Sequence, residues 1–84
     1  MRRMEAMRYI RTDIFKVSQS EFSAIAGVSQ ATVSRWEKGD LTPGLTEMGR
    51  IRHEATQRGI AWEDAVFFEG PAHADADADA EPNP

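Results

Sequence analysis

The stretch that decides the fold of this chain is Gln19-Ser-Glu-Phe-Ser-Ala-Ile-Ala-Gly-Val-Ser-Gln-Ala-Thr-Val-Ser-Arg-Trp-Glu-Lys38. Apolar side chains recur at helical spacing on both sides of Gly27, which is the pattern of two short amphipathic helices. Gly27 can adopt the positive φ that ends the first helix, and Ser29 is a good N-cap for the second. The stretch therefore predicts two helices, about 19–26 and 30–38, that cross through a tight turn.

The second of these helices has one apolar face and one polar face. Val33 and Trp36 lie on the face that we expect to pack against the first helix. The opposite face carries side chains that cannot form a core: Gln30, Ala31, Thr32, Ser34, Arg35 and Lys38. These side chains can donate, accept or present a methyl group, which are the features that distinguish base pairs in the major groove of DNA. The pattern therefore favours a helix that reads DNA.

The rest of the chain predicts three further helices. Apolar residues recur at helical spacing over residues 4–15, 45–57 and 62–67. Ser18, followed three residues later by Glu21, matches the capping box that begins a helix. No strand pattern and no internal repeat is found, so we expect an all-α domain of five helices.

Composition and charge divide the chain into two parts. Residues 1–60 hold all ten Lys and Arg against seven Asp and Glu, whereas residues 61–84 hold seven Asp and Glu and no Lys or Arg. From residue 70 onward no large apolar side chain occurs. We therefore expect a folded domain over residues 1–69 and a disordered acidic tail over residues 70–84, which would keep the protein soluble or repel DNA phosphates.

The bulk composition also excludes several classes of protein. The 84 residues allow one small domain, and the absence of cysteine removes disulfides and thiolate metal sites. No apolar run is long enough to cross a membrane, and no hydrophobic signal segment follows the N-terminal arginines. We expect a cytoplasmic, nucleoid-associated protein with no membrane partner.

At this point the chain resembles the lambda-repressor/Cro-type helix-turn-helix proteins, the xenobiotic-response-element family. The resemblance covers about residues 8–68 and is carried by Ser18-Gln-Ser-Glu-Phe22, Ala26-Gly-Val-Ser29, Thr32-Val-Ser-Arg-Trp-Glu-Lys-Gly39 and Pro43. It implies a five-helix lambda-repressor-like domain whose second and third helices form the helix-turn-helix.

The resemblance also implies roles for individual residues. Positions that face base edges in the family correspond here to Gln30, Ala31, Thr32 and Arg35. Positions suited to DNA phosphates correspond to Gln19, Ser29, Ser34 and Lys38. A helix-one arginine that pairs with a glutamate corresponds to Arg11 and Glu37. The segment between Ile10 and Gln19 is one residue longer than usual in the family, which bears on that pairing.

The resemblance implies a sequence-specific transcriptional regulator that binds double-stranded DNA, and a small repressor at a palindromic operator is the leading interpretation. Two alternatives use the same fold: an antitoxin of a toxin–antitoxin pair that regulates its own operon, and a protein-interaction module. The presence of four residues at DNA-contacting positions argues against the interaction module: Gln19, Gln30, Thr32 and Arg35.

A cluster of large apolar residues near residue 65 predicts a homodimer interface. Four of the seven residues from Trp62 to Phe68 are large and apolar, which is more than a terminal helix needs for docking. The predicted interface consists of Ile60, Trp62, Val66, Phe67 and Phe68. Two-fold dimers of this type set their reading helices about 34 Å apart along one face of DNA.

No other chemistry is indicated. His53 and His73 are isolated and lack the spacing of a zinc site, and no nucleophile lies in a catalytic pattern. The Asp and Ala alternation over residues 75–79 lacks the glycine and the distal glutamate of a calcium loop. We expect no enzyme activity, no metal, no cofactor and no small-molecule ligand.

Overall fold

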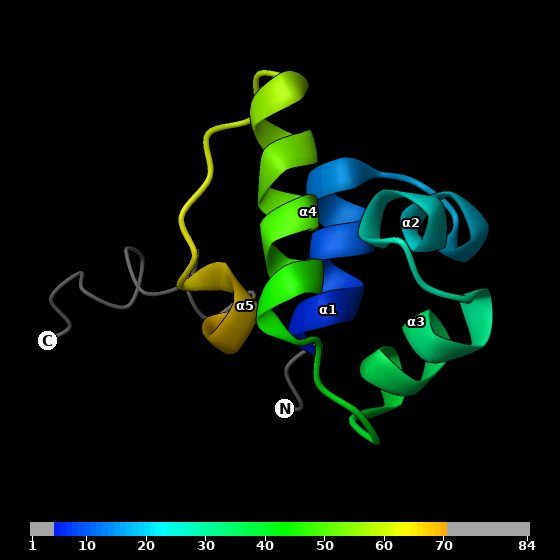
Figure 1. The fold of residues 1–84 in the computed structure, drawn as a ribbon. Helices are drawn as coiled ribbons and strands as arrows, with labels where there is room; N and C mark the ends of the chain where they lie inside the picture. The colour runs from blue at the N-terminus through cyan, green and yellow to red at the C-terminus, as the bar shows by residue number, and fades with distance from the viewer. Residues whose placement is uncertain (1–4, 71–84) are drawn as a thin grey trace, which may run out of the picture.

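The computed structural model describes residues 5–70, which form a helical domain (Figure 1). In chain order the elements are α1 (Ala6–Tyr9), the π-helix η1 (Ile10–Phe15), α2 (Gln19–Ala26), α3 (Gln30–Lys38), α4 (Leu45–Gln57) and α5 (Val66–Glu69). No strand occurs in this part of the chain, and the prediction of an all-α, five-helix domain is confirmed. None of these helices is long and apolar enough to span a bilayer.

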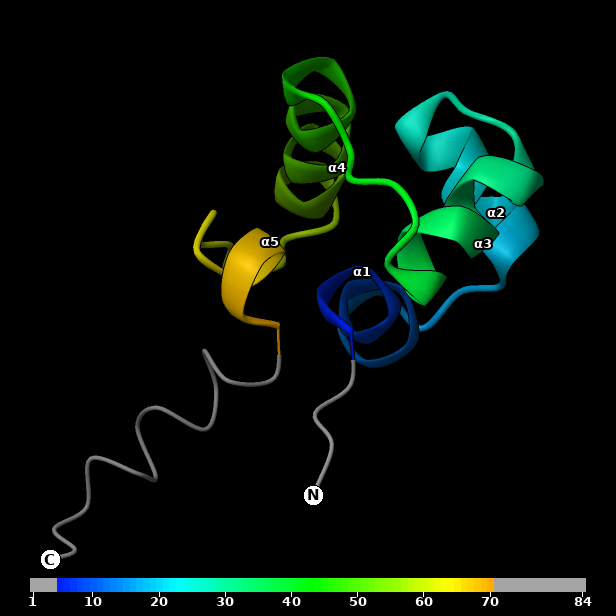
Figure 2. The ribbon, with the colours of Figure 1, turned by 90° about the horizontal axis from the view of Figure 1, so that it is seen from below.

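The helices surround one core. α2 packs against both α3 and α4, while α1 packs against α3 and α5. Viewed from below, α1 lies between α5 on one side and α3 on the other (Figure 2). The largest completely buried side chains come from five of the helical segments and are Met7, Ile10, Phe22, Val33 and Ile51.

Local signals set the ends of α2 and α3 where the sequence predicts them. The Ser18 hydroxyl accepts a hydrogen bond from the Glu21 backbone N–H, and the Glu21 carboxylate accepts one from the Ser18 N–H, each at 3.1 Å. α2 ends at Gly27, whose φ of 75° is left-handed. Ser29 caps α3, which ends at Gly39. The capping residues therefore determine where the two helices begin and end.

The first helix contains an irregularity that accounts for the extra residue in this segment. Residues 10–15 wind as a π-helix, in which each turn holds about one residue more than an α-helical turn. The segment ends at Lys16, whose φ of 58° is left-handed and whose backbone N–H donates to the Arg11 carbonyl. The extra residue is thus taken up within the helix, and Arg11 still faces α3.

The prediction of a helix over residues 62–67 is wrong in its bounds. The helix that forms is Val66–Glu69, and residues 60–63 are not helical. The Trp62 indole N–H donates to the Asp64 carboxylate at 2.9 Å, and a turn joins Glu63 to Val66. This arrangement lays the Trp62 ring on Phe15 and Phe67, so packing of the indole overrides the helical spacing.

The last of the described residues packs against the start of α1. Gly70, which the sequence assigns to the tail, is buried, and a Cβ atom at this position would lie 2.8 Å from the Ala6 Cα. The remaining tail residues, 71–84, lie outside the described residues, as do residues 1–4.

Replacing the first capping residue tests how much the local signals contribute. Ser18→Ala removes the hydroxyl that satisfies the Glu21 N–H, and should lower the free energy of unfolding by about 1 kcal/mol. Thermal unfolding followed by circular dichroism would register this as a fall in Tm of roughly 4–8 °C. Ser20→Ala is the matched control, because Ser20 is exposed in the first turn of the same helix and caps nothing. Equal Tm values for the two variants would contradict the capping role.

Candidate nucleic-acid interface

The outer face of α3 carries the residues that the sequence selects for reading DNA. Gln30, Ala31, Arg35 and Lys38 are exposed, and Thr32 and Ser34 are half-buried. On the inner face Val33 and Trp36 are almost completely buried in the core. The helix is therefore anchored along one side and open along the other.

The N-terminus of α3 holds two hydroxyls in contact with each other. The Ser29 hydroxyl accepts from the Thr32 backbone N–H at 3.1 Å, and the two hydroxyl oxygens lie 2.9 Å apart. The Thr32 side chain therefore has a fixed position beside the first turn. Its methyl group and the exposed Ala31 are the apolar features of this end of the helix.

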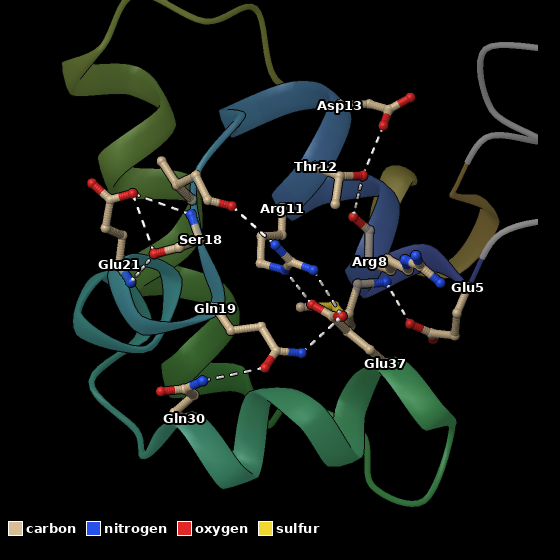
Figure 3. Close-up of polar contacts among 12 residues, drawn as sticks. Glu5, Arg8, Arg11, Thr12, Asp13, Ser18, Gln19, Glu21, Gln30 and Glu37 are labelled. Atoms are coloured by element: carbon tan, nitrogen blue, oxygen red, sulfur yellow. Dashed lines mark hydrogen bonds and ion pairs between the residues drawn. The ribbon is translucent and has the colours of Figure 1, made fainter.

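A chain of polar contacts runs from the interior to the start of α3 (Figure 3). The Arg11 guanidinium donates to both oxygens of the Glu37 carboxylate, at 2.5 and 3.1 Å, and to the Val17 carbonyl at 3.0 Å. The Gln19 amide donates to Glu37 at 3.2 Å, and the Gln30 amide lies 3.5 Å from the Gln19 oxygen. The last contact is at the long end of the hydrogen-bond range.

The Arg11–Glu37 pair is the rigid part of this chain. Its side chains are only 15% and 8% exposed, and the two parallel hydrogen bonds fix both planes. The hydrogen bond that Arg11 donates to Glu37, reinforced by the charge of the carboxylate, raises the pKa of Arg11 despite partial burial. The pairing that the family resemblance implies is confirmed, and the π-helix is what lets the longer segment preserve it.

Gln19 is held in a position compatible with its predicted phosphate contact. It is half-buried, and one of its two amide hydrogens is directed at Glu37. An amide nitrogen carries two hydrogens, so the second remains for an acceptor outside the protein. The sequence did not reveal that this side chain bridges Glu37 and Gln30.

A basic hollow of about 290 Å³ lies between α1 and α3. Its lining consists of Arg8, Arg11, Gln19, Ser34, Glu37 and Lys38. Within residues 5–70, neither Arg8 nor Lys38 uses its side-chain charge in a hydrogen bond or ion pair. Arg8 is absent from the phosphate set chosen from the sequence. Arg8 lies one helical turn from Arg11, and this spacing is the sequence signal that places both arginines on the same side of the first helix.

The residues predicted to form a dimer interface differ in their exposure to solvent. Val66 and Phe67 are 4% and 8% exposed, so these two belong to the core of the protomer rather than to a free surface. Ile60 and Trp62 are half-buried against that core, and Phe68 alone is strongly exposed. The sequence alone does not show that Val66 and Phe67 also close the core over α1.

The sequence pattern of the helix-turn-helix family, in its lambda-repressor/Cro-like form, matches residues 7–53. The match covers more than half of the chain and includes every contact between Arg11 and Gln30 described above. The chain belongs to this family. It therefore carries the domain of a DNA-binding regulator of the helix-turn-helix type. No curated protein and no solved structure gives a significant match to this helix-turn-helix chain.

Removing Glu37 tests the polar chain behind the interface. Glu37→Ala leaves the largely buried Arg11 unpaired and should lower the free energy of unfolding by about 3 kcal/mol. Urea unfolding at one protein concentration measures the change.

The matched control is Glu54→Ala, which removes the exposed pair with Arg58 on α4 and should change stability by less than about 0.5 kcal/mol. A Glu37→Ala protein as stable as the control would show that the Arg11–Glu37 pair does not hold α3 in place.

Proposed function

We propose that this protein is a sequence-specific transcriptional regulator that binds double-stranded DNA by placing α3 in the major groove. The observation that carries the proposal is the division of α3 into two faces. Val33 and Trp36 are buried in the core, whereas Gln30 and Arg35 project from the opposite side with their hydrogen-bonding groups exposed. A helix exposed in this way fits the width of the groove.

The base-reading residues have complementary chemistry. Arg35 can donate two parallel hydrogen bonds to guanine, and Gln30 can pair with the donor and acceptor edge of adenine. Ala31 and the methyl group of Thr32 can contact a thymine methyl group. The amide nitrogen of Gln30 also lies 3.5 Å from the side-chain oxygen of Gln19.

Phosphate contacts would fix the register of α3 in the groove. Gln19, Ser29, Ser34 and Lys38 surround the ends of the reading face, and Arg8 extends this set across the basic hollow. Such contacts contribute affinity that depends on salt but carry no direct sequence information.

The regulator is proposed to act as a repressor in the cytoplasm, on the nucleoid. Binding at a promoter is enough to exclude polymerase, so repression needs no surface besides the DNA-binding one. One α3 helix reads only a few base pairs, and a homodimer on a palindromic operator would double the site. We therefore include in the proposal that two copies of the chain bind one operator with two-fold symmetry.

Selection of binding sites from random duplexes, followed by gel shifts on the best site, tests the function. Arg35→Ala should reduce discrimination at one base pair by about 1–3 kcal/mol, which is roughly tenfold to a hundredfold in affinity. Other positions of the site should keep their preferences.

Lys38→Ala serves as the control from the same helix. It should weaken binding to all sequences alike and reduce the salt dependence by about one counterion. Undiminished selectivity after Arg35→Ala and Gln30→Ala together would overturn the reading role of α3. Selection that enriches no sequence at all would favour a protein-interaction module instead.

A further inference from the structure

The basic hollow between α1 and α3 holds two positive charges that no acidic group of residues 5–70 pairs with. The Arg11 guanidinium is neutralised by the Glu37 carboxylate, to which it donates two hydrogen bonds. Arg8 and Lys38 also line the hollow, and both are exposed. Neither of their side chains forms a hydrogen bond or an ion pair among residues 5–70. The complement of this hollow is therefore a group that carries negative charge.

The described part of the chain ends beside the first turn of α1. Gly70 is buried, and a Cβ atom at this position would lie 2.8 Å from the Ala6 Cα and 3.2 Å from the Ala6 Cβ. Ala6 precedes Arg8 by two residues in the same helix. α5 and α3 lie on opposite sides of α1 (Figure 2). Residues 71–84 therefore continue from one side of α1, and the basic hollow lies on the other side.

The sequence that follows Gly70 has the charge and the length to reach the hollow. Residues 71–84 contain no Lys or Arg, and their four acidic residues occupy every second position: Asp75, Asp77, Asp79 and Glu81. Five residues of chain, the separation between Gly70 and Asp75, span at most about 16–18 Å. A helix with its side chains is only about 10–12 Å across. The acidic residues therefore have enough chain to pass around α1.

We propose that residues 75–81 bind to the basic hollow of their own chain, with their carboxylates between Arg8 and Lys38. A row of regularly spaced negative charges is also the electrostatic feature of a DNA strand. The acidic residues therefore compete with a DNA phosphate for the same two cations. Because they are tethered to α1, their local concentration is on the order of millimolar, and the competition needs no second molecule.

This competition affects phosphate binding more than base reading. The base-reading residues Gln30 and Arg35 do not line the hollow. Non-specific DNA depends almost entirely on phosphate contacts, so the acidic residues weaken it most. A specific site keeps the contacts of α3 to its bases and displaces the acidic residues. The inference rests on the proposed function for this effect on DNA, whereas the contact itself forms without DNA.

A spin label tests the contact in the absence of DNA. The chain contains no cysteine, so Ala78→Cys gives a single site for a nitroxide among the acidic residues. In nuclear magnetic resonance spectra of the full chain, the nitroxide should broaden the backbone amide signals of Arg8 and Lys38. The signals of His53 and Thr56, exposed on α4, should broaden less. The difference should fade as salt is raised to 1 M, where the Debye length is about 3 Å.

Two spin-labelled variants show whether charge holds the contact. The charge-neutral variant carries Asp75→Asn, Asp77→Asn, Asp79→Asn and Glu81→Gln. The hollow variant carries Arg8→Gln and Lys38→Gln. Both should lose the preferential broadening at positions 8 and 38. Preferential broadening retained by either variant overturns the inference, as does its absence from the original chain.

A mixing experiment shows whether the contact lies within one chain. The isotope label and the spin label are placed on separate molecules, which are then mixed in equal amounts. No preferential broadening is expected. Its appearance would place the acidic residues in the hollow of another copy, and would overturn a contact within one chain.

A double-mutant cycle on a non-specific duplex separates this contact from general repulsion of DNA. In the original chain, the charge-neutral substitutions should tighten binding by about threefold to tenfold at low salt. In the hollow variant the same substitutions should change affinity by less than about twofold, because the carboxylates have no site to leave. Lys16→Asn is the matched control. It removes an exposed cation outside the hollow, at a left-handed position that asparagine tolerates, and should keep the full gain.

The outcomes of the cycle are distinct. Equal gains in the original chain, the hollow variant and the Lys16→Asn control would show general repulsion and overturn the competition, as would no gain in the original chain. Circular dichroism checks that each variant is folded. Failure of the original chain to select any duplex would overturn the proposed function, and would leave the contact seen by the spin label intact.

Discussion

The Trp36 ring meets Phe22 edge-on with the ring centroids 6.5 Å apart, and this contact determines which side of α3 remains outside. The helical period fixes the directions of all side chains relative to one another. Burying Trp36 and Val33 in the core therefore sets the rotation of α3 about its axis and leaves Gln30 and Arg35 on the opposite side. A rotation of α3 by one residue would bury polar groups without partners. The reading face is therefore a consequence of core packing rather than a separate feature.

Much of the helix-turn-helix unit was predictable because its signals are local. Ser18, Gly27 and Ser29 act through hydrogen bonds and backbone angles within a few residues of themselves, so α2 and α3 begin and end at the predicted positions. The bounds predicted for the helix over residues 62–67 were wrong because the decisive contacts are distant in sequence. Trp62 packs on a ring nearly fifty residues away, and no periodicity reveals that.

The candidate site likewise has features that the local sequence predicts and features that depend on tertiary contacts. Which residues of α3 face outward followed from the spacing of Val33 and Trp36, whereas the link from Arg11 through Gln19 to Gln30 depends on three elements meeting in space. The π-helical turn is the clearest case. One added residue in the sequence could have rotated Arg11 away from α3, and only the tertiary structure shows that the helix absorbs it.

Two glycines show how far the fold of one chain explains a residue. At Gly27 the φ is 75° and an added Cβ atom would collide with the guanidinium of Arg50, which donates to the Ala26 carbonyl. The fold of the single chain explains that residue completely. At Gly49 the backbone is helical and the space is empty, so the single chain gives no reason for it. Gly27 is thus explained by the fold, whereas nothing in the described residues explains Gly49.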